Sequence, residues 1–233
     1  MSWLRLCALA GLVVSNAAIA ADMPGTLPPP VAPVLQPVFP GAWYLRGDLG
    51  YYWGTMGAAQ APSPLPDPTD NALGNGFVGG VGAGFKSRWL RTDVTVDYTA
   101  AMKYTGTTLT SGDTTAKIDA VTALFNGYFD LGTWYGLTPY LGAGAGVANL
   151  RVHDYTSPTA NGLSNSQWKF AWAVMAGAGY SLAPNLTLDA SYRYVNFGDV
   201  MTASDAFGSM TLKNLAAHEV RVGVRWSFDD FTQ

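Results

Sequence analysis

The sequence has little charge, one cysteine and no long apolar run beyond its N-terminal segment. Charged residues make up 12% of its 233 residues, a small share for a secreted soluble domain. Cys7 lies in the N-terminal apolar run, so the rest of the chain forms no disulfide and has no thiol chemistry. No run of about 18 apolar residues occurs after residue 20. The sequence therefore contains no transmembrane helix, and membrane residence would require a β-barrel.

Residues 1–20 predict a signal peptide. They contain one basic residue, Arg5, then an apolar run over residues 6–14 and the small-residue cleavage signal Ala18-Ile19-Ala20. The apolar run is too short to span a membrane. Removal of this segment leaves 12 Lys and Arg against 16 Asp and Glu, a formal net charge of −4. That balance gives no indication of nucleic-acid binding.

Residues 21–42 form a proline-rich segment, with seven prolines between residues 24 and 40. Proline cannot donate to a β-ladder, so we expect an extended, polyproline-like leader in the periplasm. A ligand for a partner protein is the less favoured alternative.

Alternation of apolar and polar residues near the C-terminus predicts a strand with two opposed environments. One face of residues 219–228 is apolar and the other carries three charges. The apolar face comprises Val220, Val222, Val224, Trp226 and Phe228, and the opposite face comprises Glu219, Arg221, Gly223, Arg225 and Ser227. A barrel strand that contacts lipid requires this pattern.

Seven other segments follow the same rule, and their lengths of about ten residues suit a tilted membrane crossing. The alternating segments cover residues 43–53, 76–85, 90–102, 116–131, 139–152, 168–182, 186–197 and about 215–228. Short connections (86–89, 132–137 and 183–185) alternate with long polar ones (53–75, 103–115, 153–167 and 198–214).

These segments predict an all-β fold, an eight-stranded antiparallel transmembrane β-barrel with up-and-down meander topology over residues 43–228. Short turns on one rim and long loops on the other are typical of outer-membrane barrels. We therefore expect both chain ends in the periplasm, four long loops outside, and a short tail over residues 229–233.

The distribution of charge favours a membrane barrel over a soluble one. The polar faces carry twelve charges, six of each sign, and the apolar faces carry none: Arg46, Asp48, Arg91, Asp93, Asp97, Asp130, Lys169, Asp189, Arg193, Glu219, Arg221 and Arg225. Alternation alone does not tell inward from outward, but aromatic residues near the segment ends indicate interface girdles. All of the twelve except Lys169 are predicted to form a luminal ion-pair network.

That network has two interpretations. It can satisfy its own charges and plug the lumen, or it can line a narrow, gated path for ions or small solutes. Eight strands leave no open channel of general-porin size, so the plugged lumen is favoured. Glycines in the runs 82–84 and 142–146 fall on one face and make room inside a narrow barrel.

Four motifs resemble those of the small outer-membrane β-barrel family, which includes OmpA-type barrel domains and opacity-type or porin-like surface proteins. The motifs are residues 126–132 (NGYFDLG), residues 138–146 (TPYLGAGAG), Tyr192-Arg193-Tyr194 with Gly198-Asp199, and the terminal pattern Arg221-x-Gly223-x-x-Trp226-x-Phe228. The resemblance covers about residues 41–228. Many family members end on the aromatic residue, whereas five residues follow Phe228 here.

This resemblance implies residence in the cell outer membrane of a Gram-negative envelope. It also implies contact with outer-membrane lipid and lipopolysaccharide. Arg221, Gly223, Trp226 and Phe228 would serve as the signal that the barrel-assembly machinery reads. We expect a monomer with a structural or surface-interaction role, whose surface partner the sequence does not identify.

Chemistry at the outer rim is the remaining alternative. His153 borders a long loop beside Asp154 and Ser157, and His218 precedes Glu219. A lipid- or lipopolysaccharide-modifying enzyme would need such groups at the rim, but solvated loop histidines are the favoured interpretation. No pair of His or Cys residues has metal-ligand spacing. We therefore expect no enzyme, no cofactor and no metal site.

Overall fold

The computed structural model describes residues 41–63, 66–108, 112–157, 160–202, 204 and 208–228. The predicted signal peptide, almost all of the proline-rich leader and the C-terminal tail lie outside the described residues. Among the residues that are described, none belongs to a helix long and apolar enough to cross a membrane.

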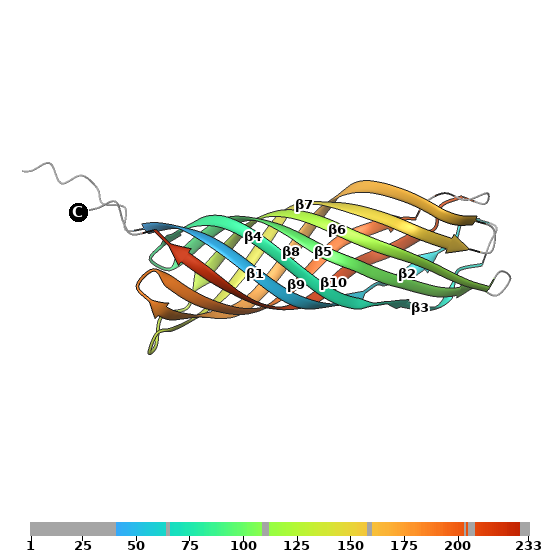
Figure 1. Cartoon of the computed structure of the whole chain (residues 1–233). Helices are drawn as coiled ribbons and strands as arrows, with labels where there is room; N and C mark the ends of the chain where they lie inside the picture. The colour runs from blue at the N-terminus through green and yellow to red at the C-terminus, as the bar shows by residue number, and fades with distance from the viewer. Residues whose placement is uncertain are drawn as a thin grey trace, which may run out of the picture. The chain divides into compact units, whose positions relative to one another are not determined.

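Eight long strands form a closed ring (Figure 1). They are β1 (Gly41–Thr55), β4 (Asn75–Ser87), β5 (Leu90–Thr108), β6 (Gly112–Asp130), β7 (Leu137–Ser157), β8 (Ala160–Ala183), β9 (Leu186–Met201) and β10 (Thr211–Ser227). Each pairs antiparallel with the next, and β10 pairs with β1. The predicted eight-stranded meander is confirmed.

The junction of β1 and β10 closes the ring in continuous register. It runs from Tyr44 opposite Ser227 to Thr55 opposite Ala216. Beyond the ladder, the Phe228 amide donates to the Trp43 carbonyl at 2.9 Å. Figure 1 shows the start of β1 beside the arrowhead of β10 at one end of the barrel. We call this end the terminal rim and the opposite end the loop rim.

The strands extend further toward the loop rim than predicted. The segments 103–115 and 153–167 were expected to be loops, yet β5 pairs with β6 as far as Thr108, and β7 pairs with β8 as far as Ser157. The segment 53–75 holds two short strands, β2 (Ala58–Gln60) on β10 and β3 (Thr69–Leu73) on β5. The loop prediction was wrong because it rested on polar composition. A strand whose outer face is in water also carries polar residues.

The two faces of the strands exchange character partway along the barrel. In β6, Phe125 is 60% exposed on the outside and Asn126 is 1% exposed inside. Seven residues before Phe125, the pattern is reversed: Ile118 points inward and is 0% exposed, and its neighbour Lys117 points outward and is exposed. The barrel is therefore apolar outside near the terminal rim and apolar inside near the loop rim.

A packed apolar interior fills this loop-rim half. Its members are almost completely buried and come from six of the eight long strands: Tyr52, Met102, Tyr104, Ile118, Leu150, Val152, Phe197, Val200, Leu212 and Leu215. We call this group the apolar layer. The apolar layer was not predicted from the sequence, because most of these residues fall in the predicted loops or near the ends of the predicted strands.

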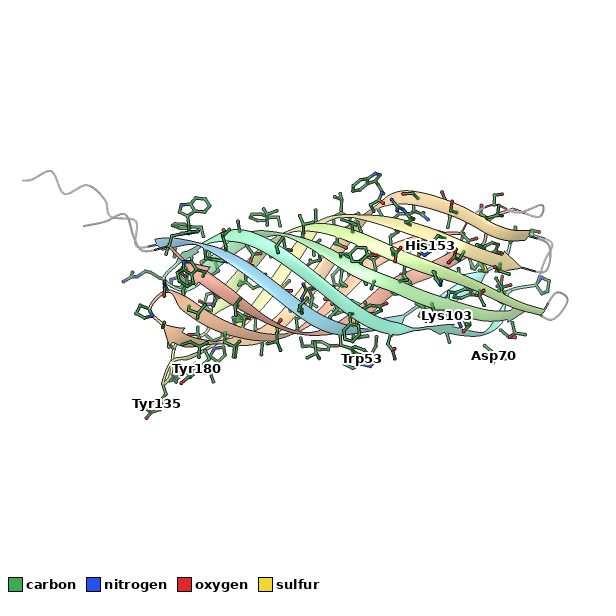
Figure 2. All side chains as sticks on the ribbon, viewed as in Figure 1. Trp53, Asp70, Lys103, Tyr135, His153 and Tyr180 are labelled. Atoms are coloured by element: carbon green, nitrogen blue, oxygen red, sulfur yellow. The ribbon has the colours of Figure 1, made fainter. Side chains whose placement is uncertain are left out.

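Exposed aromatic residues form two belts around the barrel. One lies near the terminal rim, where Trp43 contacts Phe85 at 5.5 Å between ring centroids. The second lies partway along the strands, where Trp53 contacts Tyr51 at 5.3 Å and Trp172 contacts Tyr194 at 5.5 Å. Figure 2 shows Trp53 between Tyr180 at one end and His153 toward the other. Aromatic girdles were expected at the strand ends. The second belt instead lies partway along the strands, because the strands continue beyond it.

Truncation within the apolar layer should destabilise the barrel. Leu150 is 0% exposed, so we expect Leu150→Ala to lower the free energy of unfolding by about 2–5 kcal/mol through lost burial and a cavity. Urea unfolding of refolded protein in micelles, followed by tryptophan fluorescence, measures this. The matched control Arg151→Ala, on the outer face of the same strand, should change it by less than about 0.5 kcal/mol. Equal effects of both would contradict the inverted interior.

Candidate functional site

The eleven charged residues predicted to form the luminal network all lie on the inner face of the barrel. Ten are buried, and the side chain of Arg46 is 12% exposed. They come from β1, β5, β6, β9 and β10. Alternation along each strand places these residues inside, and the closed ring then brings together strands that are distant in sequence.

Arg221 is the residue with the most ion-pair partners in this cluster. It donates from Nε and Nη2 to Asp48, from Nη2 to Asp97 Oδ1 at 2.6 Å, and from Nη1 to Glu219 Oε2 at 3.0 Å. Arg193 binds two of these three acids, at 2.8 Å to Asp97 Oδ2 and 2.7 Å to Glu219 Oε2. Two arginines and three carboxylates therefore share one set of charge-assisted hydrogen bonds.

Asp93 is the centre of a second cluster. Its carboxylate accepts from Tyr44 Oη at 2.9 Å, Asn126 Nδ2 at 2.8 Å, Tyr128 Oη at 3.2 Å and Arg46 Nη1 at 3.2 Å. The guanidinium of Arg46 also donates to Asp48 from Nη2 at 2.9 Å, and Asp48 is bound by Arg221. The two clusters are thus continuous.

A third cluster lies closer to the terminal rim. Arg91 Nε donates to Asp130 Oδ1 at 2.8 Å, and Lys86 Nζ lies 3.1 Å from the other oxygen of that carboxylate. The Arg91 guanidinium also packs on the rings of Tyr128 and Tyr140, at 4.7 and 4.4 Å from their centroids. Such cation–π contacts favour a desolvated guanidinium.

Asp189 completes this end of the lumen. It accepts from the Tyr140 hydroxyl and forms an ion pair with Arg225 at 3.1 Å. The space enclosed by Arg46, Asp48, Asp189 and Arg225 is too small for a water molecule.

Several partners in these clusters were not among the predicted site residues. Lys86 was assigned to a turn, and the polar side chains Tyr44, Asn126, Tyr128 and Tyr140 were not included. All five lie on the inner face, so the parity of each position was the available signal. Lys169, the one polar-face charge left out of the prediction, makes no ion pair within the described part of the chain.

Glycine at inner positions leaves room for these side chains. A Cβ atom on Gly80 would collide with the Asp97 carboxylate, and one on Gly144 would collide with the Asn126 amide. These close approaches explain why glycines recur on the inner faces of β4 and β7.

The two histidines are separated. His153 Nδ1 lies 3.3 Å from Asp119 Oδ2 near the loop rim. Its neighbour Asp154 forms an ion pair with Lys117 at 2.9 Å, while the side chain of Ser157 lies outside the described residues. His218 lies in the second aromatic belt, with its Nδ1 at 2.6 Å from the Tyr192 hydroxyl, and the adjacent Glu219 points into the lumen. The described residues contain no group of three or more His, Cys, Asp or Glu that could hold a metal.

The four residues of the proposed assembly signal divide between the faces of β10. Arg221 and Gly223 face the lumen, whereas Trp226 and Phe228 are 49% and 41% exposed near the terminal rim. Their recognition by the assembly machinery remains a prediction.

Comparison with known proteins gives matches that span nearly the whole chain. The family model described as outer membrane protein beta-barrel domain matches residues 8–228. An uncharacterized protein of Brucella suis biovar 1 (strain 1330) is 33% identical over an alignment that covers 96% of this chain and 99% of the relative.

Two further similarities concern named proteins. Outer membrane protein PagN of Salmonella typhimurium (strain LT2) is 35% identical over 95 residues, 39% of this chain and 40% of PagN. The crystal structure of Neisserial surface protein A superposes with a TM-score of 0.52 at 23% identity, over 80% of this chain and 97% of that one. At that identity the structural likeness concerns the fold alone.

Removal of one luminal charge should leave its arginine partners without compensation. We expect Asp97→Asn to lower the free energy of unfolding by about 3–5 kcal/mol, because loss of one partner of a buried ion pair leaves the opposite charge buried without compensation. Urea unfolding of the refolded protein measures this. Asp154→Asn is the matched control, since its pair with Lys117 is exposed to water, and it should have little effect. A similar loss of unfolding free energy in both variants would contradict the assignment of Asp97 to a buried luminal ion-pair network.

Proposed function

Because this chain belongs to the family of outer membrane protein β-barrel domains and resides in the cell outer membrane, we propose that it is a closed barrel with a structural and surface-interaction role. Long connections of outer-membrane barrels face the cell exterior. The loop rim is therefore assigned to the cell surface and the terminal rim to the periplasm.

The inverted half of the barrel carries this proposal. Beyond the second aromatic belt, the strands continue with polar residues outside and the apolar layer inside, as in a water-soluble barrel. This section stands above the membrane and supports the connections at the loop rim. Binding residues commonly lie on loops that a rigid scaffold positions, and this arrangement supplies such a scaffold.

Two successive barriers favour a closed lumen rather than a conducting channel. The ion-pair clusters occupy the membrane half, where their charged side chains contact one another at distances of 2.6–3.2 Å. The apolar layer follows in the loop-rim half, with side chains at 0–1% exposure. Conduction requires a wettable path with sites that an ion can enter and leave, and neither barrier offers one.

Rim-site catalysis has no comparable support. His153 and His218 lie at different levels of the barrel, with Nδ1 atoms 3.3 Å from Asp119 Oδ2 and 2.6 Å from the Tyr192 hydroxyl, respectively. The name of the relative PagN, an outer membrane protein, agrees with residence in the outer membrane.

Planar-bilayer recording tests closure. We expect no stable conductance steps from the refolded full chain, and none from Arg221→Ala, because the apolar layer remains intact above the altered ion-pair cluster. Flotation of the same protein with lipid vesicles, and a shift in gel mobility on boiling, verify insertion and folding. Discrete steps from the inserted wild-type protein would overturn the closed-lumen proposal.

Cysteine labelling in intact cells tests surface display. Lys103→Cys lies toward the loop rim and Tyr135→Cys in a turn at the terminal rim, as Figure 2 shows for the native side chains. We expect a membrane-impermeant maleimide to label Lys103→Cys in intact cells, and Tyr135→Cys only after the outer membrane is permeabilised. The unsubstituted protein gives the background. The reverse pattern would contradict the orientation and with it the surface role.

A further inference from the structure

The wall of the barrel is interrupted between β8 and β9. Their ladder ends where Trp172 pairs with Asn196. Beyond that point β8 stays paired with β7 as far as Ala160, and β9 stays paired with β10 as far as Met201. Residues 168–171 and 197–200 therefore face each other without a ladder, and we call this interruption the wall gap.

A bulge in β9 accounts for the separation of the strands. Gly198 adopts a φ of +73°, and its amide donates to the Asn196 side chain at 2.9 Å. The register between β9 and β10 shifts at Leu215, opposite this bulge. A glycine in the left-handed region is a common element of bulges, which bend a strand and end its regular pairing.

A side chain closes the gap on the loop-rim side. Gln167 of β8 donates from Nε2 to the Met201 carbonyl at 2.6 Å and accepts from the Met201 amide at 3.3 Å. The gap is thus bounded by this amide clamp on one side and by the Trp172–Asn196 pair on the other. We call the part of the gap between these two points the window.

The window contains a cavity of about 380 Å³. Its apolar wall includes Phe170 and Trp172, which are 66% and 40% exposed, and Phe197, which is 1% exposed and closes the cavity from the interior. The ring of Trp172 belongs to the second aromatic belt. This belt marks the membrane interface, so the cavity lies where acyl chains meet headgroups.

The charged lining of the cavity favours an anion. Lys169 lines the cavity, and the described part of the chain offers it no ion pair. Asp199 is the other charged residue of the lining, and it is already bound by Lys213 Nζ at 2.9 Å and the Asn214 amide at 3.0 Å. Because Asp199 is paired with Lys213 outside the lining, Lys169 is the charge of the lining that has no ion pair among the described residues, and it lies beside the apolar wall.

We propose that the wall gap binds one lipid that combines acyl chains with a phosphate group. The acyl chain lies against Phe170 and Trp172, and the phosphate binds the Lys169 ammonium. Backbone N–H groups at the gap, which no ladder from the opposite strand covers, can donate to further phosphate oxygens. Anionic phospholipids and lipopolysaccharide share this chemistry, whereas the choline ammonium of phosphatidylcholine already neutralises its phosphate. The proposal does not depend on whether the lumen is closed.

Native mass spectrometry of the refolded full chain in a neutral detergent tests the site. The probes are phosphatidic acid, phosphatidylcholine with the same acyl chains, detergent-solubilised lipid A and inorganic phosphate. We expect one bound phosphatidic acid or lipid A, with clearly weaker retention of phosphatidylcholine and no retention of phosphate. Comparison of phosphatidic acid with lipid A distinguishes a phospholipid from lipopolysaccharide as the source.

Lysine variants assign the binding to the gap. Lys169→Gln should weaken phosphatidic acid binding by about tenfold, the effect of losing one charge-assisted contact, whereas Lys169→Arg should retain it. Lys103→Gln removes another lysine away from the gap and should not change it. Phe170→Ala should weaken binding of both phospholipids alike. The shift in gel mobility on boiling verifies that each variant is folded.

Three results would overturn the proposal. Equal binding of phosphatidic acid by wild type and Lys169→Gln would exclude this lysine as the phosphate site. Equal retention of phosphatidylcholine and phosphatidic acid would remove the headgroup preference. Retention of inorganic phosphate without any effect of Phe170→Ala on lipid binding would indicate an ion site instead of a lipid site.

Discussion

The closed hydrogen-bonded ring is the constraint on which the rest of the structure depends. Inside a bilayer no water can satisfy a backbone amide or carbonyl, and each unpaired group costs several kcal/mol. The pairing of β10 with β1 removes the two free edges that an open sheet would leave. Closure of only eight strands then makes the lumen narrow, so that inner side chains must either be small or bind one another.

The ionic lumen is the consequence of this narrowness. Inner positions of the membrane half cannot reach bulk water, and a charge there is stable only with partners. Arg221 and Arg193 share Asp97 and Glu219, while Asp48 joins them to Arg46. Glycines at Gly80 and Gly144 provide the room that these side chains occupy. Charge and glycine on the inner faces are therefore two parts of one packing solution.

The change of environment at the second aromatic belt explains the other half of the barrel. Below the belt the exterior is lipid, so Phe125 and its neighbours face outward. Beyond the belt the exterior is water, and the inner side chains, among them Ile118, Leu150 and Phe197, pack as a hydrophobic core inside the same closed ring. The wall gap lies at this transition, where the ladder between β8 and β9 stops and backbone groups can meet polar headgroups instead of hydrocarbon.

Period-two alternation is local, so the sequence by itself determined the eight long strands of the ring and the placement of Arg46, Asp97 and Arg221 on the face opposite the apolar one. It could not determine which charges meet, because that depends on the register between strands far apart in the chain: Asp48 and Arg221 are 173 positions apart. The extended strands and the apolar layer were also hidden, since polar composition does not distinguish a loop from a strand whose outer face is in water. Only the tertiary structure decided these features and the gap at Gly198, because each arises from how strands are paired and bent, not from the pattern within any one strand.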